Sequence, residues 1–163
     1  MPTSFAIAIG SNRRGRHGAP TAEVRASVAA LAELGRVIRA APIFDTAPLG
    51  PSSRRFANSA VLLECALDPP AVLAALKRIE HDFGRRRGRR WGARVIDLDI
   101  VLWSGGAWRG RDLTIPHVAF RTRRFVLDPL VQIMPDWRDP RSGRTVRQIA
   151  ARARAVDRAA IRP

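Results

Sequence analysis

The pattern of hydrophobic and polar positions along the chain predicts four β-strands. The expected strands cover residues 5–9, 37–45, 59–67 and 95–103. Pro42 interrupts the second of them. Because proline cannot donate a hydrogen bond to a neighbouring strand, we expect a bend or an edge position there.

Apolar residues at helical spacing predict two helices between these strands. The first is expected to begin with Thr21 as its N-cap and to end at Gly35, and the second to begin at Asp68 and to end at Gly84. The order of elements is therefore βαββαβ. It predicts an α+β fold of the ferredoxin-like type, an antiparallel sheet with its helices packed on one face. The other face is expected to be free to bind a ligand.

Beyond residue 103 the pattern is less regular. Ser104-Gly105-Gly106 predicts a hairpin turn, residues 125–134 form an apolar stretch, and a basic amphipathic helix is expected from about Thr145. We interpret this part as a C-terminal extension. The whole chain of 163 residues, 1–163, is expected to form a single domain with a core that needs no disulfide.

The composition limits the environment in which the protein works. Cys65 is the only cysteine, so an internal disulfide and a cysteine-based zinc site are excluded, and a reducing cytoplasm is expected. No apolar stretch approaches the ~18 residues that span a bilayer, and the N-terminus does not resemble a signal peptide. We therefore expect a cytoplasmic protein that does not bind membranes.

The chain is strongly basic. Lys and Arg number 29 against 14 Asp and Glu, which gives a net charge of +15. Such an excess suits anionic partners. The arginines are spread over the whole chain, however, which is typical of a composition bias in the source genome rather than of one targeted patch.

The most informative chemical feature is a pair of carboxylates in the fourth strand. Asp97 and Asp99 share one face of that strand, roughly 7 Å apart at a rise of ~3.3 Å per residue. The opposite face carries an apolar row suited to a core: Ile96, Leu98, Ile100 and Leu102. Two like charges on a sheet call for a cation. Because the arginine-rich segment 85–94 precedes them, the pattern predicts nucleotide phosphates held with Mg²⁺.

Six short motifs occur in a fixed order along the chain. They are Gly10-Ser11-Asn12, Thr46-Ala47-Pro48-Leu49-Gly50, Phe56-Ala57-Asn58, Arg90-Trp91-Gly92-Ala93-Arg94-Val95-Ile96-Asp97-Leu98-Asp99, Leu113-Thr114-Ile115-Pro116-His117 and Arg123-Arg124-Phe125-Val126-Leu127. Together they resemble the 6-hydroxymethyl-7,8-dihydropterin pyrophosphokinase family, over residues from about 5 to 140. The resemblance implies a diphosphokinase of folate biosynthesis. Such an enzyme transfers pyrophosphate from ATP to the hydroxymethyl group of the reduced pterin and releases AMP, with two Mg²⁺ ions.

The resemblance also assigns individual residues. It implies that Asp97 and Asp99 hold both metal ions, that Asn58 binds the polar edge of the pterin, and that Phe56 and Phe125 lie on either side of the ring. The catalytic set is Arg85, Arg94, Asp97 and Asp99. The pterin-binding set is Thr46, Pro48, Leu49, Phe56, Asn58, Trp91 and Phe125. The ATP-binding set is Lys77, Glu80, Arg87, Trp91, Arg94, Ile100, Thr114, His117 and Arg123.

Some positions depart from the family pattern or allow another interpretation. The family usually has Leu-Gly and an acid where this chain has Arg13-Arg14-Gly15-Arg16, and Asp112 and Val118 also differ from common family residues. For Phe56 and Phe125, a place in the hydrophobic core is the alternative. For any single arginine of segment 85–90, a solvated surface charge is the alternative interpretation.

The main alternative function is a nucleic-acid-binding module, since a basic ferredoxin-like domain resembles RNA-recognition motifs. The chain has no Tyr, however, and two acids lie on the sheet face that RNA would need. A purely structural basic protein would leave the carboxylate pair unexplained. We therefore expect ATP and the pterin as partners, no specific nucleic acid, and a monomer.

Overall fold

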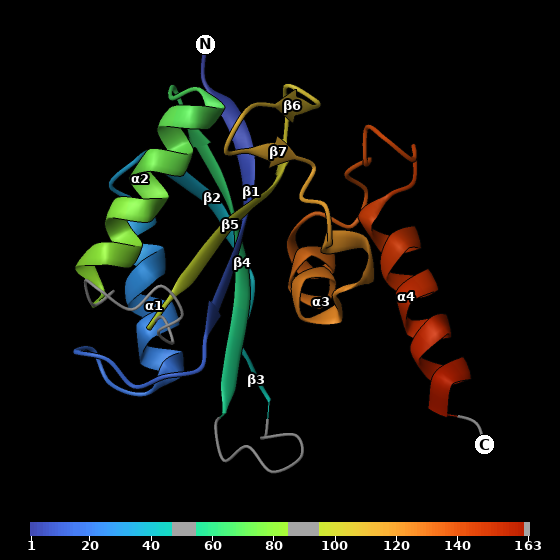
Figure 1. Cartoon of the computed structure of the whole chain (residues 1–163), viewed down its shortest axis with the longest axis horizontal. Helices are drawn as coiled ribbons and strands as arrows, with labels where there is room; N and C mark the ends of the chain where they lie inside the picture. The colour runs from blue at the N-terminus through green and yellow to red at the C-terminus, as the bar shows by residue number, and fades with distance from the viewer. Residues whose placement is uncertain (47–54, 85–94, 162–163) are drawn as a thin grey trace.

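The computed structural model of the chain describes residues 1–46, 55–84 and 95–161. Its centre is an antiparallel sheet in the order β2 (Arg36–Ala40), β4 (Phe56–Cys65), β1 (Thr3–Ser11) and β5 (Asp97–Trp103), shown in Figure 1. A short strand, β3 (Phe44–Thr46), also pairs with β4. The sequence therefore predicted the α+β class and the antiparallel sheet correctly.

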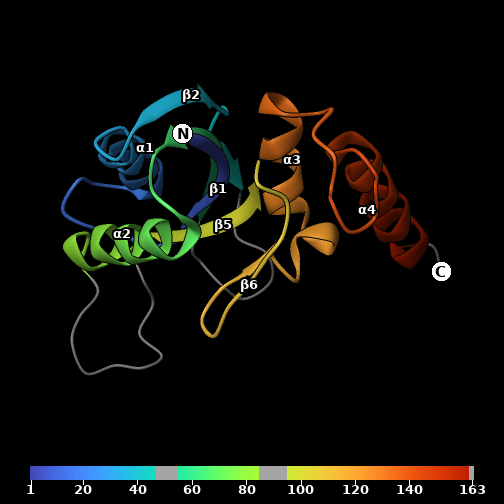
Figure 2. The same cartoon turned by 90° about the horizontal axis from the view of Figure 1, so that it is seen from above.

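Helices lie on both sides of this sheet. Helices α1 (Pro20–Leu31) and α2 (Pro69–Asp82) share one hydrophobic cluster with β1, β4 and β5, so both pack on one face as expected. The opposite face is partly covered by α3 (Arg124–Ile133), against which α4 (Val146–Ile161) packs, and Figure 2 shows the two layers of helices. The expectation of a free second face is therefore wrong.

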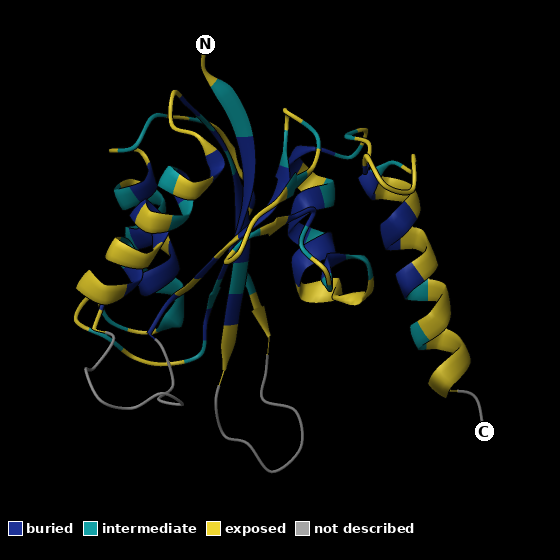
Figure 3. Ribbon diagram, turned by 45° about the horizontal axis from the view of Figure 1, so that its top comes forward, coloured by how far each residue is buried: buried dark blue, intermediate teal, exposed yellow. Residues whose placement is uncertain are grey.

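The reason for this difference is the apolar stretch that follows the sheet. Its residues recur at helical spacing and form the buried side of α3, which is Val126, Leu127, Leu130 and Ile133. Small side chains on the sheet, such as Ala6 and Ala60, let this helix approach closely. Buried positions accordingly line both sides of the sheet, whereas the last turns of α4 are exposed (Figure 3).

Several boundaries differ from those predicted by the sequence. Pro42 splits the expected second strand into β2 and β3, which confirms an interruption at that point. Strand β4 begins at Phe56 rather than Ser59, because its first residues pair with β3. Helix α2 has Asp68 as its N-cap, whose carboxylate accepts a hydrogen bond from Ala71 N at 2.9 Å, and Gly84 follows its end with φ 109°.

The predicted ends of the first helix are wrong. Ala19 is the N-cap and Pro20 takes the first helical position, where the fixed φ of proline suits a helix, so Thr21 lies inside α1. The helix ends at Leu31, well before Gly35. Gly35 instead allows a close approach to β4, because a Cβ on it would collide with the backbone of Glu64.

A β-bulge changes the side-chain pattern late in β5. Ala6 pairs with Leu102 whereas Ile7 pairs with Ile100, so Val101 is an extra residue in β5. Leu102 therefore packs on the α3 side rather than in the predicted row with Ile100. Trp103 returns to the other face and stacks on Phe5 at a centroid distance of 6.2 Å. Asp97 and Asp99 precede the bulge and keep their predicted face.

The C-terminal part begins with a hairpin against the outer edge of β5. Strands β6 (Trp108–Arg109) and β7 (Thr114–Ile115) form this hairpin, and η1 (Phe120–Thr122) connects it to α3. Gly106, with φ 99°, forms the predicted turn, and α4 begins directly after Thr145 as expected. Within the described residues, no helix is long and apolar enough to cross a membrane.

Candidate active site

Three residues from three neighbouring strands form a row across the sheet. Gly10 of β1 pairs with Asn58 of β4 on one side and with Asp97 of β5 on the other. Because adjacent strands lie ~4.8 Å apart, the Cα atoms of Asn58 and Asp97 are roughly 10 Å apart. An amide side chain and a carboxylate thus stand at opposite ends of one row, on the face that α3 partly covers.

The sheet surface between the Asn58 amide and the two carboxylates is lined by residues with small side chains or none. In the next row Ala8 pairs with both Ala60 and Asp99. Gly10 has no side chain, and a Cβ on it would lie only 3.2 Å from Asn58 Oδ1. Small residues therefore form a floor on which a flat ligand could reach from the amide to the carboxylates.

The sequence did not identify Gly10 as part of this site. The Gly10-Ser11-Asn12 motif indicated a turn, whereas Gly10 and Ser11 lie inside β1. A glycine within a strand often marks a close approach of a ligand or another backbone, and this was the available signal. The residues that lie beside Gly10 in the neighbouring strands are known only from the strand register.

The carboxylate pair lies as the strand pattern predicted. Asp97 and Asp99 are exposed, whereas Leu98 and Ile100 between and after them are each only 3% exposed and face the core. Among the described residues, no group of three or more His, Cys, Asp or Glu side chains could hold a metal ion. Two carboxylates still fit Mg²⁺, because this ion is usually bound by one or two carboxylates together with substrate phosphates and waters.

Two residues from outside the sheet hold the outer edge of β5, one through its side chain and one through its backbone. Glu80 of α2 is buried, and its Oε1 accepts a hydrogen bond from Leu98 N at 2.9 Å. The backbone N–H of His117 donates to Val101 O at 3.0 Å. The resemblance assigns both residues to ATP binding. In the structure, each holds a backbone group of the strand that carries the aspartates.

The remaining residues of the expected ATP pocket lie around β5. Thr114 is exposed in β7, and Lys77 is exposed on α2. His117 is half-buried, and its Nδ1 accepts a hydrogen bond from Ala119 N at 3.2 Å. Ile100 faces the core on the side opposite the aspartates, so its side chain does not share their surface.

Exposed aromatic side chains belong to the expected pterin-binding set. Phe56 is 41% exposed and, two residues before Asn58 in β4, shares its face. Phe125 is 53% exposed in the first turn of α3, and the guanidinium of Arg123 lies 5.8 Å from its ring centroid. Thr46 is paired with Phe56, and its hydroxyl donates to Phe56 O at 3.2 Å. Neither phenylalanine is a core residue.

Six of the predicted site residues lie outside the described residues. They are Pro48, Leu49, Arg85, Arg87, Trp91 and Arg94.

An ion pair between a half-buried arginine and a buried aspartate holds the segment between the β6–β7 hairpin and α3. Asp139 is fully buried and accepts two hydrogen bonds from the guanidinium of Arg121, at 2.7 and 2.8 Å. Burial alone raises the pKa of Asp139. Hydrogen bonds from Arg121, Ser142 and the backbone of Arg141, together with the charge of Arg121, outweigh burial and lower this pKa to about 2. The sequence reasoning did not single out this aspartate.

We expect Asp139→Asn to lower the thermal midpoint at pH 7 by about 5 °C, because it removes the buried carboxylate that pairs with the half-buried Arg121. The folded-state pKa of about 2 lies below the ordinary value of 3.8. The carboxylate therefore stabilises the fold above pH 3.8, and this contribution is lost as the pH falls toward 2. Thermal unfolding followed from pH 7 to pH 2 should show this loss in the parent chain but not in the variant. The control is Asp136→Asn, which removes the carboxylate of an exposed pair with Arg147; an equal effect of both variants would contradict the assignment.

Comparison with known proteins gives the same family as the motifs. The model of the 7,8-dihydro-6-hydroxymethylpterin-pyrophosphokinase (HPPK) family matches residues 6–135. The 2-amino-4-hydroxy-6-hydroxymethyldihydropteridine pyrophosphokinase of Pseudomonas aeruginosa is 36% identical over 148 residues, which cover 89% of this chain and 88% of that protein. The protein of the same name from Haemophilus influenzae is 35% identical over 139 residues, covering 83% of this chain and 84% of that protein. The one from Synechocystis sp. is 40% identical over 125 residues, covering 74% of this chain and 64% of that protein.

Solved structures resemble the fold over almost the whole chain. The wild-type HPPK-DHPS of Plasmodium falciparum with STZ-DHP has a TM-score of 0.75 at 14% identity, covering 99% of this chain. This chain spans 45% of that longer protein. At this identity, the similarity shows the fold alone.

The family model and the relatives define the chain as a transferase of the kinase class. The chain belongs to the 7,8-dihydro-6-hydroxymethylpterin-pyrophosphokinase family, whose members transfer pyrophosphate from ATP to hydroxymethyldihydropterin in folate biosynthesis. The family and the type of enzyme predicted from the sequence motifs are thereby confirmed.

Proposed function

We propose that this chain transfers pyrophosphate from ATP to the hydroxymethyl group of 6-hydroxymethyl-7,8-dihydropterin, with Asp97 and Asp99 holding two Mg²⁺ ions. The observation that carries the proposal is the row from Asn58 through Gly10 to Asp97, with Asp99 beside it. It provides an amide for the acceptor at one end and carboxylates for a metal–phosphate group at the other. The flat floor between them suits a planar ring.

Each side chain has a separate task in this proposal. Mg²⁺, when bound, neutralises the negative charge that develops on the transferred group and on the departing AMP. Asp97 and Asp99 fix the position of that charge. The Asn58 amide pairs with donors and acceptors on the pterin edge, and the rings of Phe56 and Phe125 stack on the pterin. This orientation brings the acceptor hydroxyl toward the β-phosphorus of ATP.

The remaining predicted residues belong to the ATP side of the proposal. The nucleotide and its phosphates are assigned to Lys77, Glu80, Arg87, Arg94, Ile100, Thr114, His117 and Arg123, with Arg85 acting on the transferred group. Arginine suits this task because it stays charged and binds phosphate oxygens in a bidentate way. The pterin is further contacted by Trp91, Thr46, Pro48 and Leu49.

The proposal also covers the type of fold, the oligomeric state and the cellular location. The order β2-β4-β1-β5, with α1 and α2 on one face, supports a ferredoxin-like core. We propose that residues 1–163 act as one pyrophosphokinase domain, as a monomer in the cytoplasm. The single, buried Cys65 supports a reducing compartment.

The experiment that tests this function measures which nucleotide is released. The chain is incubated with ATP, Mg²⁺ and 6-hydroxymethyl-7,8-dihydropterin, and the products are separated by chromatography. We expect AMP and the pterin diphosphate in equal amounts. Release of ADP, or no turnover with this acceptor, would contradict the proposal. Salt-sensitive RNA binding without ATP turnover would support the nucleic-acid alternative.

The floor of the site gives a further prediction. Gly10→Ala places a Cβ 3.2 Å from Asn58 Oδ1, so the amide must move by a few tenths of an ångström. We expect pterin affinity to fall by about 3- to 10-fold, because a small displacement of a positioning group weakens binding. Isothermal titration with the pterin measures the change, and titration with ATP and Mg²⁺ is the internal control. An equal loss for both ligands would contradict a role of this floor in pterin binding.

A further inference from the structure

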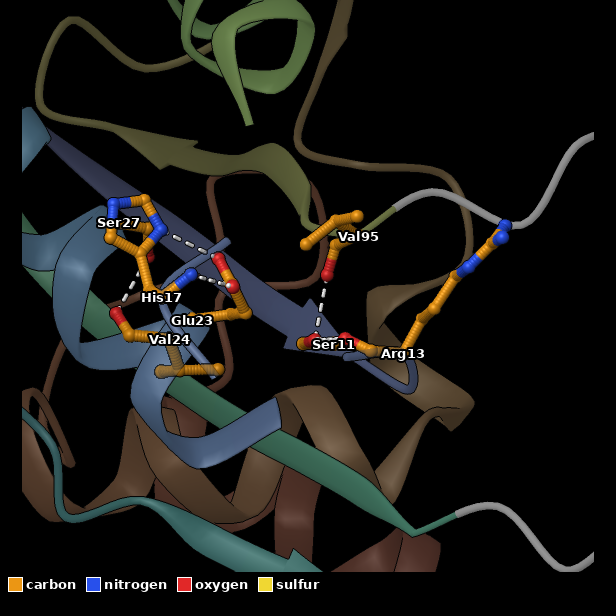
Figure 4. A network of polar contacts seen from close by, with 7 residues as sticks. All are labelled: Ser11, Arg13, His17, Glu23, Val24, Ser27 and Val95. Carbon is orange, nitrogen blue, oxygen red and sulfur yellow. Dashed lines mark hydrogen bonds and ion pairs between the residues drawn. The ribbon is translucent and has the colours of Figure 1, made fainter. Parts of the chain in front are cut away.

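Outside the candidate active site, the chain contains a buried carboxylate whose contacts converge on the start of β5. Glu23, in the first turn of α1, is 0% exposed. Its two oxygens accept hydrogen bonds from the same residue, from His17 N at 2.7 Å and from His17 Nδ1 at 2.8 Å (Figure 4). Because a buried carboxylate is unfavourable without such partners, Glu23 holds His17 in one place.

His17 belongs to a tight turn that also contacts the end of α2. Gly15 N donates to Gly18 O at 3.0 Å, and Gly18 N donates to Gly15 O at 3.2 Å, which closes the turn formed by residues 15–18. The His17 ring lies 4.8 Å from the ring of Phe83, and the Arg16 guanidinium lies 5.9 Å from it. The turn is therefore held from two sides, by α1 and by the residue that caps α2.

The same turn presses directly on Val95. A Cβ on Gly15 would lie 2.5 Å from Val95 Cγ1 and 2.6 Å from Glu23 Oε1, so only glycine fits between them. Beside this contact, the Ser11 hydroxyl donates to Val95 O at 2.6 Å (Figure 4). The first contact packs against the Val95 side chain and the second holds the Val95 carbonyl, two residues before Asp97.

These contacts matter because strand pairing ends at this point. The last pair between β1 and β5 is Gly10 with Asp97, so the β1–β5 hydrogen-bond ladder does not extend to Val95. The position of Asp97 at the start of its strand then depends on what holds the preceding residues. Turn 15–18 and Ser11 provide that support.

We propose that Glu23 is a positioning residue for Asp97, acting through His17 and turn 15–18 on Val95. The inference rests on the proposed function, in which Asp97 and Asp99 hold the metal–phosphate group. It assigns a task to Gly15, which belongs to the segment Arg13-Arg14-Gly15-Arg16 where this chain departs from the usual family pattern. A site that must keep two carboxylates at a fixed separation is more rigid when the residues just before their strand are held in place.

The first test needs neither metal nor substrate. Hydrogen–deuterium exchange of the ligand-free chain is compared for the parent, Glu23→Gln and Glu64→Gln. Glu64→Gln is the matched control, because the half-buried Glu64, near the end of β4, pairs with the exposed Arg36 at 2.9 Å, away from β5. We expect Glu23→Gln to raise the exchange rate of the peptide covering residues 95–100 by about 10-fold, since the residues before β5 are no longer held in place. Unchanged exchange in this peptide overturns the proposal.

The second test separates the hydrogen bond to Glu23 from the packing of the His17 ring. His17→Asn keeps a side-chain N–H donor, and His17→Phe keeps a ring on Phe83 but has no donor. We expect Glu23→Gln and His17→Phe to lower kcat by about 10-fold and to raise the Mg²⁺ concentration for half-maximal rate, with the KM for the pterin unchanged. His17→Asn should stay near the parent. The opposite ranking of the two His17 variants overturns the proposal.

Two further variants keep the outcomes distinct. If Glu23→Gln does not fold, Gly15→Ala replaces it, because its Cβ would collide with both Val95 Cγ1 and Glu23 Oε1 and so disturbs the same contacts with the Glu23 carboxylate still present. A parent-like exchange pattern and rate in Gly15→Ala would overturn the proposal.

The variants also separate the positioning role from the proposed function. If Asp97→Asn is inactive and Glu23→Gln has the same exchange and rate as Glu64→Gln, the positioning role is wrong and the proposed function stands. Full activity in Asp97→Asn overturns both.

Discussion

Replacement of Asp97 or Asp99 by asparagine lowers kcat by about 100-fold or more, while the protein remains folded. An amide keeps the size of the side chain but removes the negative charge that the proposed metal–phosphate group requires. A loss of this size corresponds to about 2.7 kcal/mol of transition-state stabilisation. Because both side chains are exposed and point away from the core, the thermal midpoint should change by less than about 2 °C.

The measurement is AMP release under saturating ATP, Mg²⁺ and pterin. The control is Asp136→Asn, the same change of charge at an exposed aspartate beyond α3. It should leave the rate unchanged. Near-parent activity in either Asp97→Asn or Asp99→Asn would contradict the metal assignment, whatever the effect on stability.

Replacement of Asn58 by alanine weakens pterin binding by about 10- to 100-fold and leaves ATP binding within about 2-fold of the parent. The amide stands at the end of the row opposite the aspartates, so its loss leaves polar groups of the bound pterin without partners. Such unsatisfied groups are worth about 1–3 kcal/mol. Because Gly10 separates Asn58 from the carboxylates, the substitution should change the affinity for the pterin much more than the affinity for ATP.

Isothermal titration with each ligand measures this difference. Gln132→Ala removes an exposed amide from α3 and serves as the control. A larger loss for ATP than for the pterin in Asn58→Ala would place this residue on the nucleotide side. Equal losses for both ligands would indicate a general disturbance of β4 rather than a specific contact.

Local patterns account for much of the site. The alternation in residues 95–103 established that Asp97 and Asp99 share a face, because successive side chains of a strand point to opposite sides whatever lies beside them. The cap at Asp68 and the end at Gly84 are also local effects, since they depend on backbone groups only a few residues away. Such features could be predicted without knowledge of the neighbours.

Other features depend on contacts between distant parts of the chain. The bulge at Val101 moves Leu102 to the other face, and it is visible only in the register between β1 and β5. Glu80 lies on a predicted helix, but its hydrogen bond to Leu98 N requires the position of α2 against β5. The buried state of Asp139 and Glu23 likewise follows from packing, because sequence periodicity gives no sign of a carboxylate enclosed by its partners.

The sequence by itself determined the α+β class, the enzyme family and the two carboxylates, because strand alternation, helix caps and short motifs are encoded in neighbouring residues. Only the tertiary structure decided that Gly10 lies between Asn58 and Asp97, that α3 covers part of the face expected to be free, and that turn 15–18 supports the entry of β5. These arrangements arise from strand pairing and side-chain packing between residues far apart in the chain. No local pattern can specify them.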